Sequence, residues 1–162
     1  MRRDPDVVLA AVQNKGYAMK YAGAELVEDP TFMMKIVQEC SRTYKIAGLK
    51  AYEFSPLEYA QTNVRKNKAI VLEAVSRQPF ALCFADPELR DDAEFVIACV
   101  TKNGLALEYV SKRLKMNMMI VETAIKGNPN ALIYASADVR HDPGIQKMVK
   151  EMLATRSFST VK

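Results

Sequence analysis

The chain has 162 residues, of which 49% are hydrophobic and 26% are charged, and its formal net charge is +4. This composition is typical of a globular domain that buries a core, and it excludes a disordered or fibrous chain. No apolar run approaches the roughly 18 residues of a membrane span, and the start of the chain lacks the pattern of a targeting peptide. We therefore expect a soluble protein.

The charge balance and the cysteines limit the partners and cofactors. The basic excess is mild compared with the dense basic patches of nucleic-acid-binding proteins, so nucleic acid is permitted as a partner but not indicated. The three cysteines lack CxxC spacing, and His141 is the only histidine. We expect no disulfide framework, no metal and no cofactor. The expected compartment is a reducing one, such as the cytoplasm or an organelle interior.

The clearest pattern is a repeat of about 25 residues. Residues 103–111 recur at 128–136 with the shared pattern Asn-x-x-Ala-Leu-x-Tyr-x-Ser, and related copies lie at 16–22, 56–60 and 79–85. The predicted units are residues 4–28, 29–66, 67–91, 92–116 and 117–141, followed by a capping half-unit at 142–154 and a tail at 155–162. A fixed period of this size is typical of stacked repeats.

Each unit begins with a predicted amphipathic helix. Apolar residues recur at positions i, i+1, i+4 and i+5, as in the first copy with Val7, Val8, Ala11 and Val12. Before each stripe stands a residue whose side chain can accept from the first free helix amides: Asp4, Asp29, Asn67, Asp92, Asn117 or Asp142. Proline follows three of these caps, in the first helical position that it favours. These residues predict where six helices begin.

A shorter second element follows, and it buries an Ala-Leu pair. It opens near Gly16, Ser55-Pro56, Pro79, Gly104 or Pro129. The spacing from Ser55 to Glu58 also matches a capping box. The expected fold is all-α: one domain over residues 1–162, built as an α-solenoid of stacked helical hairpins with roughly eleven helices.

The second unit is longer than the others because it carries an insert at residues 42–54. Inserts in repeat proteins often lie on the binding face, which makes this segment a candidate for partner contact. A plain structural loop is the alternative. The candidate contact residues in the insert are Arg42, Tyr44, Lys45, Tyr52 and Phe54.

The segment from Leu89 to Ser111, together with residues 128–136 and 140–143, resembles the helical repeat known as domain of unknown function 4116. The resemblance covers nearly the whole chain apart from the insert and the last dozen residues. It implies a helical repeat of the kind found in multi-repeat proteins of protists and algae and in some bacterial effectors, with no catalytic residues to carry over. Val27 stands where that family usually has a basic residue.

Basic residues recur two positions before five of the six caps, and they form a predicted ladder along one edge: Arg2, Arg65, Arg90, Lys115 and Arg140. The ladder could bind phosphates or an acidic peptide. The favoured alternative is that each side chain pairs with a neighbouring cap carboxylate or helix C-terminus. Aromatic residues also recur, and we expect them in the core between repeats: Tyr21, Tyr59, Phe84, Tyr109 and Tyr134.

No phosphate loop, nucleophile elbow or zinc-protease motif is present, so we expect no enzyme activity. We expect His141 to lie beside a helix cap, Cys99 to be buried and inert, and Cys83 to be accessible. The leading functional prediction is a non-catalytic protein–protein interaction or scaffold module, an accessory subunit or adaptor of a larger complex. The alternative is a nucleic-acid-binding repeat array that uses the basic ladder and exposed aromatic residues.

Overall fold

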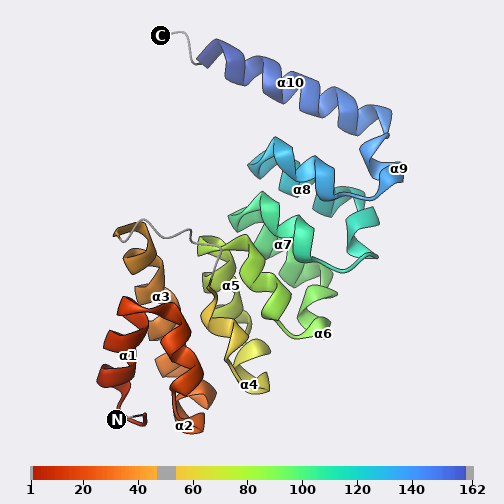
Figure 1. The fold of residues 1–162 in the computed structure, drawn as a ribbon. Helices are drawn as coiled ribbons and strands as arrows, with labels where there is room; N and C mark the ends of the chain where they lie inside the picture. Colours follow the sequence, from red (N-terminus) through yellow and green to blue (C-terminus); the bar gives the residue numbers. More distant parts are fainter. Residues whose placement is uncertain (1, 47–53, 160–162) are drawn as a thin grey trace. The chain divides into compact units, whose positions relative to one another are not determined.

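The computed structural model describes residues 2–46 and 54–159, with side chains described for residues 2–39 and 54–154 (Figure 1). All regular secondary structure in these ranges is helical, which confirms the all-α prediction. The chain divides into two compact units, Met1–Leu89 and Arg90–Lys162. Within the described ranges, no helix combines the length and the apolarity needed to cross a bilayer.

The first unit contains three long α-helices, each followed by a short 3-10 helix and a short α-helix. The elements in chain order are α1 (Pro5–Asn14), η1 (Gly16–Tyr21), α2 (Ala24–Glu28), α3 (Pro30–Ile46), η3 (Pro56–Glu58), α4 (Thr62–Arg65), α5 (Lys68–Arg77), η4 (Pro79–Phe84) and α6 (Pro87–Arg90). Helix α3 has 17 residues, whereas α1 and α5 have ten each. The first part of the insert therefore lengthens α3.

The second unit has a similar order, except that its first repeat has a 3-10 helix, η6, in place of the short α-helix. Its elements are α7 (Ala93–Lys102), η5 (Gly104–Tyr109), η6 (Leu114–Met116), α8 (Met118–Gly127), η7 (Pro129–Tyr134), α9 (Ala137–Arg140) and α10 (Pro143–Ser159). Each full repeat thus has three helical segments, where the sequence predicted a two-helix hairpin. The described segments therefore outnumber the roughly eleven helices expected. The third segment is only three to five residues long, too short to show a periodic apolar pattern.

The predicted helix caps are confirmed at all six positions. In each, one side-chain oxygen accepts from backbone amides in the first helical turn; Asp92 Oδ1, for example, lies 3.0 Å from Glu94 N and 3.1 Å from Phe95 N. These bonds satisfy helix N–H groups that have no intrahelical partner. The prediction of a capping box at Ser55 is wrong. The buried hydroxyl of Ser55 makes no hydrogen bond, and it is the backbone carbonyl of Ser55 that accepts from Glu58 N.

Within each unit, the long helices pack in chain order. In the first unit α1 packs on α3 and α3 on α5, and in the second α7 packs on α8. The core of each unit lies between these helices and the 3-10 segments: Met33, Ile36 and Leu57 are buried in the first, and Leu107, Ile120 and Ile125 in the second. The predicted apolar stripe therefore forms the contacts between successive repeats.

Candidate functional site

A groove in the first unit lies between the N-terminal halves of α3 and α5. Its volume is about 490 Å³. It is lined by Pro30, Thr31, Met34, Lys35 and Gln38 from α3, and by Asn67, Ala69 and Ile70 at the start of α5. The lining thus comes from the first nine residues of α3 and from the cap and first turn of α5.

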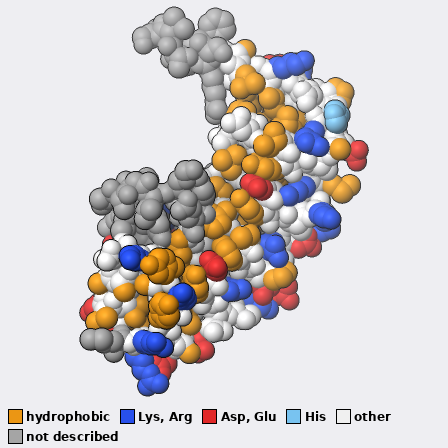
Figure 2. All heavy atoms as spheres, in the orientation of Figure 1, with side chains coloured by type: hydrophobic (Ala, Val, Ile, Leu, Met, Phe, Trp, Pro, Cys, Tyr) orange, Lys and Arg blue, Asp and Glu red, His pale blue; other side chains and the backbone are white. Residues whose placement is uncertain are grey.

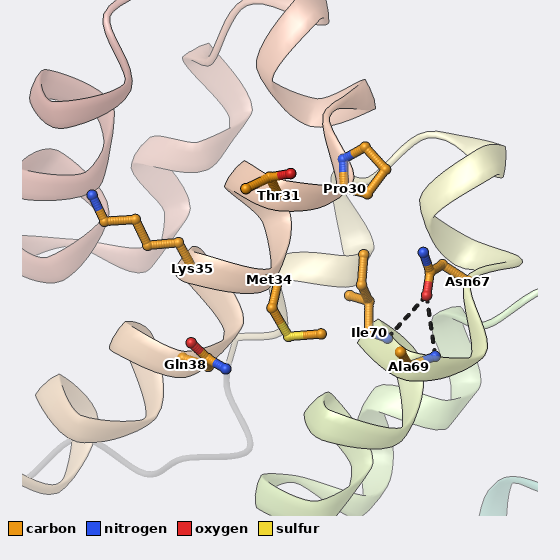
Figure 3. A pocket seen from close by; sticks show the side chains of 8 residues that line it. All are labelled: Pro30, Thr31, Met34, Lys35, Gln38, Asn67, Ala69 and Ile70. Atoms are coloured by element: carbon orange, nitrogen blue, oxygen red, sulfur yellow. Dashed lines mark hydrogen bonds between the residues drawn. The ribbon is translucent and has the colours of Figure 1, made fainter.

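The groove has an apolar floor and a polar rim. Figure 3 shows the Met34 side chain between the two helices, directed toward Ile70 and Ala69. Ile70 is 2% exposed and closes the bottom, whereas Ala69 is exposed and leaves the side open. Thr31 and Gln38 are exposed on the α3 side. An apolar floor with a few polar groups is the usual design of a binding pocket.

The charged and amide groups of the groove have defined roles. Asn67 Oδ1 caps α5 by accepting from Ala69 N at 3.1 Å and Ile70 N at 3.3 Å, and its amide nitrogen points away from the helix (Figure 3). Lys35 Nζ lies 3.5 Å from Asp6 Oδ1 on α1, so its ammonium is directed toward the first repeat. The rim therefore offers uncharged donors and acceptors, which suit a peptide backbone or an amide side chain.

Sequence reasoning missed this groove, although one signal was present. The residue two positions after the cap is Ala69 in the third repeat and a larger side chain in the other full repeats: Asp6, Thr31, Glu94 and Met119. The third repeat thus has the smallest side chain at this position, and Ala69 lines the groove.

Three side chains of the basic ladder donate to backbone carbonyls within their own repeat. Arg65 Nη2 donates to Glu58 O at 2.7 Å and Nε donates to Ala60 O at 2.8 Å. The ammonium of Lys115 donates to Glu108 O at 2.6 Å, and Arg140 Nη1 donates to Ile133 O at 3.3 Å. The carbonyls of Glu58, Glu108 and Ile133 lie seven residues earlier, at or next to the end of a 3-10 helix, and the carbonyl of Ala60 lies five residues earlier. This is the helix-terminus role that the sequence analysis favoured over ligand binding.

The backbone at the same positions joins successive short helices. The same backbone hydrogen bond recurs with donors one repeat later, at 2.7–3.2 Å: Gly23 N to Arg2 O, Gln61 N to Val27 O, Asp86 N to Arg65 O, Ser111 N to Arg90 O and Ser136 N to Lys115 O.

The ladder side chains differ in their surroundings. Burial lowers the pKa of Lys115. The Nε atoms of Arg90 and Arg140 are buried without a hydrogen-bond partner. Arg2 differs from the others, since its guanidinium lies 5.8 Å from the centre of the Tyr21 ring.

The candidate contact residues of the insert fall mostly outside the described side chains. Arg42, Tyr44 and Lys45 lie in α3 beyond the described side chains, and Tyr52 lies outside the described residues. Phe54 is only 5% exposed and its ring centre lies 6.1 Å from that of Tyr59. Phe54 therefore packs in the core just before η3, and a partner contact at this residue stays a prediction.

The prediction for the recurring aromatic residues needs correction as well. Tyr21 is exposed and the other four are half-buried, so they border the core rather than fill it. Three methionines are also exposed, Met116 at the end of η6 and Met118 and Met119 at the start of α8. On the face drawn in Figure 2, hydrophobic side chains gather over α7 and α8.

The predicted exposure of Cys83, burial of Cys99 and position of His141 beside a helix cap are confirmed. Cys83 is exposed, whereas Cys99 is buried and desolvation raises the pKa of its thiol to about 12. His141 ends α9, with Nδ1 2.7 Å from Ala137 O. Because a carbonyl only accepts, Nδ1 carries the proton in this contact. Among the described residues, no three His, Cys, Asp or Glu side chains are arranged to hold a metal ion.

A second polar contact recurs between repeats just before the caps. Asp91 accepts from the Ser111 hydroxyl and forms an ion pair with Arg113 Nη2 at 3.1 Å. These hydrogen bonds lower the pKa of Asp91, with the Ser111 contact as the main cause. One repeat earlier the charges are reversed, because Lys66 Nζ lies 3.1 Å from Glu88 Oε2. This contact therefore has a structural role in both units.

Comparison with known proteins gives a family but no relative. Searches of curated proteins and of solved structures return no match. A family profile matches the chain twice, over residues 4–54 and 92–140, and its description is "Domain of unknown function (DUF4116)". The two matches together cover more than half of the chain and agree with the repeated arrangement of caps and helices. The chain therefore belongs to the DUF4116 family.

Proposed function

We propose that this chain is a non-catalytic protein-interaction module, an accessory or scaffold subunit whose α3–α5 groove binds a segment of a protein partner. The observation that carries the proposal is the groove of about 490 Å³ with an apolar floor at Met34 and Ile70. Its volume falls within the range of about 300–1,000 Å³ that is common for binding pockets. One large apolar side chain of the partner enters beside Met34, and the partner's backbone on either side of it forms hydrogen bonds with the polar groups of the rim.

The repeats themselves support the scaffold role. In each unit the long helices pack in chain order and the short helices are joined by the same backbone hydrogen bond. We propose that this stacking continues along the chain as an α-solenoid, an architecture that presents extended binding surfaces. Small-angle X-ray scattering tests the shape, since a compact 162-residue domain has a radius of gyration of about 15 Å. A solenoid gives a larger value.

The contacts of the basic ladder weigh against the alternative of a nucleic-acid-binding array. Arg65, Lys115 and Arg140 donate to backbone carbonyls of their own repeats, so these side chains are held in place and fewer of their N–H groups remain for phosphates. A ladder engaged in this way contributes to folding rather than to counterion release.

The experiment that tests the groove is a pull-down from the source cells with nuclease treatment, comparing two arginine variants. Ala69→Arg places a long charged side chain in the groove. Ala10→Arg makes the same change at an exposed position of α1 that lines neither described cavity. We expect a defined set of proteins that resists nuclease, is retained by Ala10→Arg and is lost with Ala69→Arg. Equal retention by both variants refutes the groove, and loss of every partner on nuclease treatment refutes the protein-binding role.

A further inference from the structure

The first repeat exposes apolar side chains at positions that the other repeats bury. Val7 is 45% exposed, whereas the residues three positions after the other caps are at most 5% exposed: Phe32, Ile70, Phe95, Ile120 and Ile145. Val7 lines a cavity of about 170 Å³ together with Ala11 from α1 and Ala18 and Tyr21 from η1. We call these four residues the α1–η1 face. Tyr21 is 52% exposed.

Repeat equivalence indicates what kind of element fits this face. Long helices pack side by side in both units, α3 on α1 and α8 on α7, and the residues equivalent to Val7 in α3 and α8, Phe32 and Ile120, are buried. The α1–η1 face therefore has the shape of a surface that accepts another helix. Its cavity is smaller than the roughly 300 Å³ of a typical small-molecule pocket, so it accommodates an apolar side chain.

The charge around the face indicates the chemistry of that helix. Arg2 lines the cavity, and its guanidinium lies over the Tyr21 ring. The ammonium of Lys20 lies 4.7 Å from the centre of the same ring and 5.8 Å from that of Tyr17. In the described part of the chain, neither Arg2 nor Lys20 has a carboxylate ion-pair partner. The rim is cationic and complements acidic side chains.

We propose that the α1–η1 face binds an acidic amphipathic helix of a protein partner. An apolar side chain of that helix fills the cavity beside Val7 and Ala11, and its flanking carboxylates pair with Arg2 and Lys20. A second copy of this chain fits poorly through its last helix, because α10 carries Gln146 and the exposed cation Lys150 where apolar stripe residues stand in earlier repeats. This face belongs to the interaction module proposed above but does not depend on the α3–α5 groove.

The test measures the binding of two synthetic peptides to the 162-residue chain. Each peptide has about 18 residues, enough for measurable helicity, and carries leucines at i, i+4 and i+7. One has glutamates beside the leucines and the other has lysines. We expect the glutamate peptide to bind at least about tenfold more tightly in fluorescence anisotropy. We also expect it to shift the backbone amide resonances of Val7, Ala11 and Ala18, while those of Gln38 and Ala69 in the groove stay unchanged.

Two matched variants separate this surface from a general electrostatic effect. Val7→Glu and Ala10→Glu make the same charge change at exposed positions in α1, where a glutamate near the helix N-terminus is tolerated. We expect Val7→Glu to weaken binding at least about tenfold and Ala10→Glu to change it less than about twofold. Ala69→Arg leaves this binding intact, so failure of the groove proposal and failure of this one are distinguishable.

Several results overturn the proposal. They are equal affinity for the two peptides, no amide shift at a peptide concentration of about 1 mM, or a Val7→Glu variant that binds as the unmodified chain does. Sedimentation of the chain alone as a dimer that Val7→Glu dissociates would assign the face to a second copy. Binding of a uridine homopolymer that displaces the glutamate peptide would assign it to nucleic acid.

Discussion

A substitution of Gly104 by alanine tests the close packing between η5 and α8. A Cβ atom at this position would lie 2.2 Å from Ala124 O and 3.1 Å from Asn128 N, both backbone atoms of the next repeat. Ordinary van der Waals contact for such an atom begins near 3.4 Å. The two segments must therefore separate by about 1 Å, because no flexible side chain stands between them to move aside.

The cost of that separation follows from what η5 carries into the core. Ala106 and Leu107 are fully buried in the same short helix, so moving η5 away from α8 loosens their contacts. Overpacking of a core typically costs about 1–3 kcal/mol, and we expect the upper half of that range because backbone opposes the new atom. For a chain of this size such a loss lowers the melting temperature by about 4–12 °C.

Gly127→Ala is the matched control, since it adds the same methyl group to the same unit. Gly127 ends α8, and the nearest atom to its added Cβ is Val100 O at 3.6 Å, an ordinary contact. Alanine is favoured over glycine in helices by about 0.5–1 kcal/mol, so this variant should be as stable as the unmodified chain or more stable. Urea unfolding followed by circular dichroism measures both. If Gly104→Ala unfolds at the same urea concentration as Gly127→Ala, the close approach is not a constraint.

Two further predictions address the ladder and the thiols. Lys115→Met removes the hydrogen bond to Glu108 O and should cost about 1–2 kcal/mol in urea unfolding, whereas Lys112→Met at the exposed neighbouring position should change stability by less than about 0.5 kcal/mol. Because burial lowers the pKa of Lys115 in the folded state, the contribution of Lys115 to the free energy of unfolding should grow as the pH rises toward 10.5. If the free energies of unfolding of the Lys115→Met variant and the unmodified chain differ by the same amount at every pH, this expectation is contradicted. In a Cys40→Ser background, an aromatic disulfide reagent at pH 8 should label Cys83 in the folded protein and Cys99 only after unfolding, and prompt labelling of Cys99 would show that its burial and raised pKa do not protect it.

The caps and the apolar stripes could be predicted from the sequence because they are local. An Asp or Asn oxygen two or three residues before a free helix amide needs no tertiary partner, so all six helix starts were predicted correctly. The resemblance to the DUF4116 repeat also came from this local pattern, and the family match confirms it. The buried Cys99 followed from its place in the stripe.

Other features depend on which surfaces meet, and only the tertiary structure decided them. Periodicity assigns Val7 and Ile70 to the same stripe position, yet one is exposed and the other is buried, because burial requires a neighbouring helix. The groove depends on α3 and α5 lying side by side with the small Ala69 between them. The side chain of Lys115 turns to Glu108 O only because η5 ends within its reach. Contacts between segments distant in the chain arise from packing, which a local sequence pattern does not encode.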